Sequence, residues 1–285
     1  MASPTRAKKR LGNYLAELRK ARGRDQPDLA NALRTTRVSL SRYESGHVLP
    51  PWAMTQLLLK ELDASDSERS EALARWEEAN DEPPSVRLPT DAPKAFRTLV
   101  NAERQASKVQ NISVMAIPGL LQTERYARAL FDAAHRFHRP DANPTTVINS
   151  RLARQKRLDG HDPLALHVLL DAALIERQVG GPEVMCEQLE HLLRAGERPN
   201  ITLQVIPFKT GAYGPMGGPC TIVNYPDPAD PPGVYLEYVA GGAWVDNEVD
   251  VKRFTTMFDD VANVALSAAD TSSLIRKRLG ALGDR

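Results

Sequence analysis

Residues 25–46 of the chain, DQPDLANALRTTRVSLSRYESG, decide how its first part folds. Asp25 can cap the start of one helix, and Pro27 suits the first turn of that helix, where a backbone N–H has no partner within the helix. Thr36 can cap a second helix, which Gly46 can end in the left-handed conformation that glycine adopts without strain. The stretch therefore predicts two short helices joined by a tight turn.

The side chains of these two helices divide into an inward and an outward set. Ala30 is small enough for a close helix crossing. The apolar residues at helical spacing are expected to point inward, and they are Leu29, Leu33, Leu40 and Tyr43. The outward set lies near the start of the second helix and comprises Arg37, Val38, Ser39 and Arg42. In a helix-turn-helix, such positions of the second helix reach base edges in the major groove.

The stretch resembles the Cro/repressor-type (XRE) helix-turn-helix, because it has a Gln, then Leu-Ala, then a Thr cap and Ser-Arg-x-Glu-x-Gly. The resemblance implies DNA contacts by seven side chains, which are Gln26, Thr36, Arg37, Val38, Ser39, Ser41 and Arg42. It implies that Gln26 and Thr36 hold phosphates and that residues 37–39 meet bases, while Arg42 can do either.

The same resemblance implies an ion pair between Arg19 and Glu44, which fixes the first helix of the domain onto the second helix of the motif. This chain departs from the family in the turn, where Arg34 replaces the usual glycine. A non-glycine residue in a left-handed turn costs about 1 kcal/mol, which the motif can tolerate.

The charge of the chain is unevenly distributed. Its net charge is +1, but residues 1–50 contain eleven Lys and Arg against four Asp and Glu, so the remainder is net negative. A basic terminus by itself is often only solvated. Where it coincides with a helix-turn-helix, it favours binding to a polyanion, and we expect double-stranded DNA.

Length and composition indicate a folded protein of about two domains, with 285 residues of which 42% are hydrophobic and 26% charged. No uncharged apolar run reaches the ~18 residues of a membrane span, and the basic N-terminus leads into an amphipathic segment rather than a secretory signal. Cys186 and Cys220 are the two cysteines, too few for a disulfide framework. We expect a cytoplasmic protein without a membrane partner.

The sequence divides into an all-α N-terminal helix-turn-helix domain of five helices (1–80), a Pro-rich linker (81–93) and a regulatory and dimerisation domain (94–285). Helical patterns come first in the last of these, at 96–109, 120–137, 171–179 and 182–195. Period-two strands follow at 201–208, 221–225, 234–239 and 244–245, then helices at 248–266 and 272–279. We therefore predict an α+β domain whose helices precede a small antiparallel sheet and a closing helix.

This second domain resembles the one that follows the helix-turn-helix in WhiJ-like, or antitoxin-like, actinomycete regulators. The likeness rests on Pro118-Gly-Leu-Leu-Gln-Thr123, Arg151-x-x-Arg154-Gln155, Gln204-Val-Ile-Pro207 and Tyr235-x-Glu237, and it covers roughly residues 11–280. Ala172 departs from the pattern, since these domains often have an acidic residue there. The resemblance implies a regulator that is paired with a small partner protein.

Candidate partner or effector residues in this domain are Arg151, Arg154, Gln155 and Glu237. The first three can form an anion or partner site on one helix face, or they can be a solvated basic face. Glu237 lies among apolar strand residues and is expected to pair with one of the arginines. We expect no cofactor and no metal site, because His135 and His138 lack accompanying ligands, and we expect no enzymatic activity.

Two functional hypotheses follow. The first is a sequence-specific transcriptional regulator that binds a palindromic operator as a homodimer and is modulated by a small protein or ligand. The second is an antitoxin-like interaction protein whose main role is to sequester a partner protein. A stable stoichiometric partner after copurification distinguishes the second from the first.

Overall fold

The structure is a computed structural model that describes residues 6–80, 86, 88, 89, 92–138, 143–214, 216–227, 230–238 and 241–283. The chain forms two units, Met1–Pro84 and Ser85–Arg285. Most of the expected linker at 81–93 lies outside the described residues.

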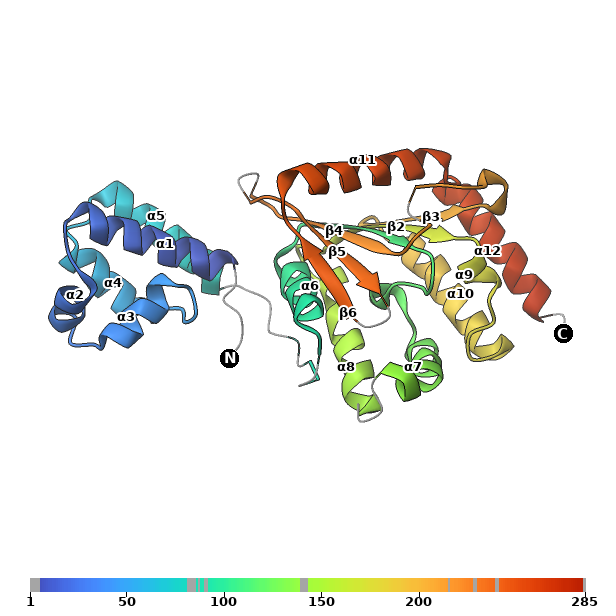
Figure 1. Cartoon of the computed structure of the whole chain (residues 1–285), viewed down its shortest axis with the longest axis horizontal. Coiled ribbons are helices and arrows are strands. Elements are labelled where there is room, and N and C mark those ends of the chain that lie inside the picture. The colour runs from blue at the N-terminus through green and yellow to red at the C-terminus, as the bar shows by residue number, and fades with distance from the viewer. Residues whose placement is uncertain are drawn as a thin grey trace. The chain divides into compact units, whose positions relative to one another are not determined.

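The first unit contains the five predicted helices (Figure 1). They are α1 (Arg6–Ala21), α2 (Gln26–Ala32), α3 (Arg37–Glu44), α4 (Trp52–Glu61) and α5 (Asp66–Asn80). Their apolar stripes meet in one core, which includes Leu11, Leu15, Leu29, Leu40, Leu58 and Leu59. Gly12 lets α1 approach α3 closely, since a β-carbon there would lie 2.5 Å from the carbonyl oxygens of Tyr43 and Glu44.

The caps and the turn of the motif have the local geometry that the sequence predicts. The Asp25 side chain accepts a hydrogen bond from the backbone N–H of Asp28 at 2.8 Å. Thr36 Oγ1 accepts one from the backbone N–H of Ser39 at 3.0 Å. Arg34 occupies the left-handed region with φ +51°, so the turn keeps the backbone shape that usually takes glycine.

The second unit is built on one six-stranded mixed sheet in the order β3-β2-β1-β4-β5-β6. Strands β1 (Lys108–Ser113), β2 (Ala165–Asp171) and β3 (Ile201–Ile206) are parallel to one another. Strands β4 (Cys220–Asn224), β5 (Gly233–Tyr238) and β6 (Gly241–Val245) extend the sheet in antiparallel pairs. The predicted α+β class is confirmed. The expected small antiparallel sheet is wrong, because the sheet has six strands and β1, β2 and β3 are parallel to one another.

Around the sheet, the described residues of this unit form ten helical segments: α6 (Lys94–Gln105), η1 (Gly119–Leu121), α7 (Glu124–His138), α8 (Pro144–Gln155), η2 (Lys156–Leu158), α9 (Ala173–Glu176), α10 (Pro182–Gly196), η3 (Phe208–Thr210), α11 (Glu248–Val264) and α12 (Ala268–Gly283). The helix expected to reach residue 109 ends at Gln105, and the one expected at 171–179 is shorter, because Asp171 belongs to β2 and the helix there is α9. The closing helix is longer than expected and packs beside α10.

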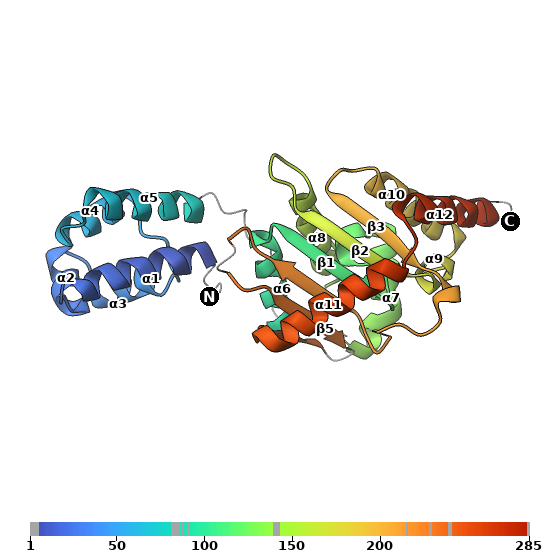
Figure 2. The ribbon, with the colours of Figure 1, turned by 90° about the horizontal axis from the view of Figure 1, so that it is seen from above.

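The two faces of the sheet bury different cores. Helix α11 covers one face, where Phe258 and Val261 pack on Ile112, Ile222 and Val234 (Figures 1 and 2). The opposite face is covered by helices that include α6 and α10. Since both faces are covered, strands such as β2 read as nearly continuous apolar runs rather than as alternating ones.

Candidate functional site

Helix α3 presents a polar surface at its N-terminal end. Leu40 is 1% exposed and anchors the helix in the core, whereas Val38 is 68% exposed. The side chains of Thr36, Arg37 and Arg42 are also exposed, and those of Ser39 and Ser41 are partly exposed. Arginine guanidinium groups donate to guanine edges, and an aliphatic side chain can contact a thymine methyl group, so this surface has the chemistry that reads a major groove.

A buried cluster fixes α3 against α1 and α2. Arg19 donates to both carboxylate oxygens of Glu44, from Nε at 2.6 Å and from Nη2 at 3.0 Å, and the two residues are 9% and 8% exposed. The hydrogen bond with Glu44 raises the pKa of Arg19. The ion pair implied by the sequence is thus present, and it sets the orientation of the exposed end of α3.

Gln26 belongs to the same cluster, since its Nε2 donates to Glu44 Oε2 at 2.7 Å. One N–H of the amide is engaged by this bond, and the second remains for a phosphate oxygen. The Thr36 hydroxyl oxygen accepts the capping hydrogen bond from the backbone N–H of Ser39 and lies 2.9 Å from the Ser39 hydroxyl. That these seven side chains contact DNA stays a prediction.

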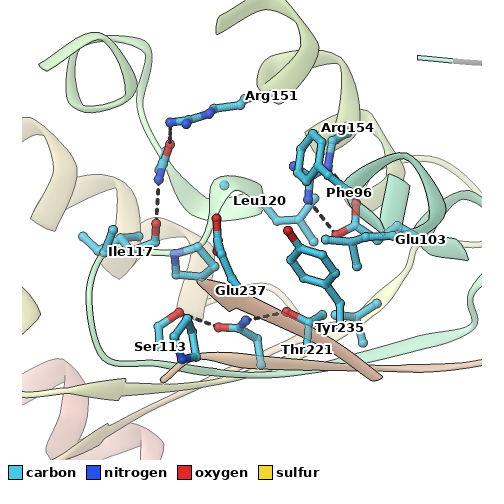
Figure 3. Close-up of a pocket in the computed structure, with 18 of the residues that line it drawn as sticks. Phe96, Glu103, Ser113, Ile117, Leu120, Arg151, Arg154, Thr221, Tyr235 and Glu237 are labelled. Carbon is cyan, nitrogen blue, oxygen red and sulfur yellow. Dashed lines mark hydrogen bonds and ion pairs between the residues drawn. The ribbon is translucent and has the colours of Figure 1, made fainter. Parts of the chain in front are cut away.

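The second unit contains a pocket of about 220 Å³ on the sheet face opposite α11 (Figure 3). Its floor is a row of polar side chains on three neighbouring strands, because Asn111 pairs with Thr221 and Thr221 pairs with Tyr235. Ser113 and Glu237 lie two residues further along β1 and β5 and also line the pocket. The sheet therefore places five polar groups where the rest of this face is apolar.

Arg154, one of the predicted site residues, lies in the pocket wall as half of a buried ion pair. Its Nε and Nη2 each donate to one carboxylate oxygen of Glu103 at 2.7 Å. Its guanidinium also lies over the Phe96 ring, 5.3 Å from the centroid. Among the described residues no ion pair joins Glu237 to an arginine, although Arg151 and Arg154 lie near enough to lower its pKa, and Arg154 pairs with Glu103, on α6.

Arg151 and Gln155 hold the loop around η1, and their expected role in an anion or partner site stays a prediction. Arg151 Nη1 donates to Gln122 Oε1 at 2.7 Å, and Gln122 Nε2 donates to the Ile117 carbonyl at 2.6 Å. Gln155 Nε2 donates to the carbonyls of Gly119 and Gln122. The quoted Pro118–Thr123 motif thus contributes Pro118, Gly119, Leu120 and Gln122 to the lining of the pocket.

The ionisable groups in the pocket influence one another. Burial raises the pKa of Glu237, and the guanidinium groups of Arg151 and Arg154 oppose this rise. Burial and the nearby Glu237 raise the pKa of the Tyr235 hydroxyl, so it stays protonated. The residues that the sequence reading missed are Glu103, Asn111, Ser113, Thr221 and Tyr235. For the four of them that lie on strands, the one sequence signal is that polar residues recur at alternate strand positions.

The structure gives less support to a reactive cysteine or a metal site than to the two sites above. Burial raises the pKa of the Cys220 thiol to about 12, which makes it a poor nucleophile. The part of the chain that the structure describes holds no cluster of three metal-ligating side chains. The side chains of His135 and His138 fall outside that part. No helix among the described residues is long and apolar enough to cross a membrane.

Comparison with known families agrees with the division of the chain into two units. Residues 10–72 match the model of a helix-turn-helix domain, which indicates a DNA-binding regulator. Residues 96–277 match the model described as domain of unknown function (DUF5753), over more than half of the chain. The chain belongs to the family that is defined by this domain. Comparisons with curated proteins and with solved structures gave no match.

Proposed function

We propose that the protein is a sequence-specific transcriptional regulator that binds double-stranded DNA through α3. The exposed end of α3, fixed from below by the buried Arg19–Glu44 pair, is the observation that supports this most directly. A helix that has to fit base edges needs such fixing, because a loosely held side chain loses entropy on binding. The excess of basic residues in the first fifty residues adds attraction to phosphates.

We further propose that it acts as a homodimer on a palindromic operator. One recognition helix reads only a few base pairs, so useful affinity requires two half-sites about 34 Å apart. The second unit is the proposed dimerisation and regulatory module. It would respond to a small protein partner, as in WhiJ-like regulators, or to a small ligand.

The test is an Arg37→Ala variant of the full chain, titrated by fluorescence anisotropy against an operator selected from the DNA upstream of its own gene and against scrambled DNA. Loss of a good base contact costs ~1–3 kcal/mol, which corresponds to a roughly 5- to 150-fold loss of operator preference. The matched control is Arg253→Ala, which removes the same charge from an exposed site on α11. Operator preference equal to that of the unaltered protein would refute the assignment of the reading surface.

An antitoxin-like interaction protein is the second candidate. It is favoured by exposed large apolar side chains of the second unit, since Phe208 is 67%, Met216 59% and Val249 63% exposed. Copurification of a stoichiometric partner whose activity is masked would support it, and a lone dimer bound to a palindrome would favour the regulator.

We also propose that the protein is not an enzyme. The hydroxyl groups on the pocket floor, those of Ser113 and Thr221, are hydrogen-bonded to the Asn111 amide and not to a base that could activate them. Trial substrates should therefore bind to the pocket without turnover.

A further inference from the structure

The pocket contains two polar side chains that have no hydrogen-bond partner among the described residues. Tyr235 is 4% exposed, and its hydroxyl points into the pocket (Figure 3). Glu237 projects from the same strand toward η1, and the structure gives it no ion pair within the described chain. Glu237 is exposed, and the Tyr235 hydroxyl is not cut off from solvent, so both groups are open to a ligand that enters the pocket.

The hydrogen bonds on the pocket floor show whether its side chains offer donors or acceptors to a ligand. Asn111 Nδ2 lies 3.3 Å from the Cys220 carbonyl, which can only accept, so this side of the amide must be the donor. The Asn111 Oδ1 therefore faces Ser113, whose hydroxyl donates to it at 2.6 Å. With its hydrogen used in this way, Ser113 offers only an acceptor to the pocket.

The charged side chains of the pocket wall also leave a carboxylate without an ion pair. Arg154 is committed to Glu103, and Arg151 donates to Gln122. The carboxylate of Glu237 has no ion pair among the described contacts, although the guanidinium groups of Arg151 and Arg154 are near enough to lower its pKa. A ligand there meets acceptor oxygens from Glu237, Ser113 and Tyr235, and an ammonium group carries three donors that suit such a set.

The backbone is shaped to hold Tyr235 in this position. A β-carbon at Gly242, which pairs with Glu237 on the next strand, would come within 2.4 Å of the Tyr235 ring. Phe96 packs edge-on against the same ring, with centroids 6.4 Å apart at an interplanar angle of 60°. The Tyr235 ring is thus held in place on the same strand as Glu237, while the Phe96 ring lies under the Arg154 guanidinium.

We propose that this pocket binds a small molecule with a protonated amine, whose ammonium group donates to Glu237, Tyr235 and Ser113. The volume of about 220 Å³ is below the roughly 300–1,000 Å³ of pockets for drug-sized ligands, so the ligand is a small metabolite rather than a peptide. Binding itself does not depend on DNA. Only a role of the amine as effector rests on the proposed function.

The test uses the full chain without DNA and three probes of matched shape: phenylethylamine, phenylethanol and phenylacetate. Binding is measured by ligand-observed NMR and calorimetry near neutral pH. We expect the amine alone to bind. Glu237→Gln keeps the shape but removes the charge and should weaken amine binding about tenfold or more, because charge-assisted hydrogen bonds are the strong ones. Tyr235→Phe should weaken it by a smaller factor.

The matched control is Glu197→Gln, an exposed carboxylate at the end of α10, which should leave amine binding unchanged. The proposal is overturned if phenylacetate binds as well as the amine, if Glu237→Gln binds the amine with unchanged affinity, or if no probe binds at millimolar concentration. A separate titration of operator DNA with and without the amine then tests the effector role, so failure of the site and failure of the proposed function are distinguishable.

Discussion

The substitution Glu44→Gln tests the internal support of the recognition helix. Glu44 accepts three hydrogen bonds, two from Arg19 and one from Gln26, and both members of the ion pair are less than a tenth exposed. The amide retains the shape and one acceptor oxygen but leaves the guanidinium of Arg19 buried without a counter-charge.

Breaking a buried pair from one side costs about 3–5 kcal/mol, and the retained acceptor places the expected loss near the lower end, at about 3 kcal/mol. A loss of that size changes the unfolding equilibrium of the first unit by roughly 100-fold. For a unit of this size it lowers the melting temperature by roughly 12–24 °C.

Urea unfolding of the full chain, followed by tryptophan fluorescence, measures this loss. Trp52 and Trp76 lie in the first unit with ring centroids 4.8 Å apart, so the signal includes its transition. Glu17→Gln, at an exposed position of α1, is the matched control and should change stability by less than about 0.5 kcal/mol. Equal stability of the Glu44→Gln and Glu17→Gln proteins would refute the role of the pair.

Two further predictions concern the same unit. Gly12→Ala should destabilise it by about 1–3 kcal/mol, because the new methyl group meets the carbonyl oxygens of α3 at 2.5 Å, and an unchanged thermal midpoint by circular dichroism would contradict that contact. Glu68 has a pKa lowered to about 2, first by its hydrogen bond from Arg22, so its stabilising effect is present above the usual pKa of 4.5 and is lost as the pH falls toward 2. Glu68→Gln should flatten acid unfolding between these values, and an unaltered pH profile would argue against the Arg22 contact.

The first unit was predictable because its signals are local. The cap residues Asp25 and Thr36 each bond a backbone N–H three residues ahead, so sequence spacing alone fixes them. Even the strained turn at Arg34 could be anticipated from the position of a missing glycine. The close approach at Gly12 could not, since it depends on where a helix distant in sequence packs.

The second unit was harder to predict because its decisive contacts are long-range. Strand β1 was missed because Asn111 and Ser113 stand at inward positions where apolar residues are expected. Strand β2 was missed because helices cover both of its faces, which removes the alternation that marks a strand. Asn111 and Thr221 meet across 110 residues of sequence, so no local pattern could place them together in a pocket.

The measurement that tests the central claim most directly is methylation interference on the bound operator. Methylation of guanine N7 blocks the major groove, whereas methylation of adenine N3 blocks the minor groove. If α3 reads the major groove in a dimer, N7 methylation will prevent binding at two clusters of guanines about 34 Å apart, and Arg37→Ala will remove one guanine from each cluster. Interference confined to adenine N3, or no interference at all, would contradict the account.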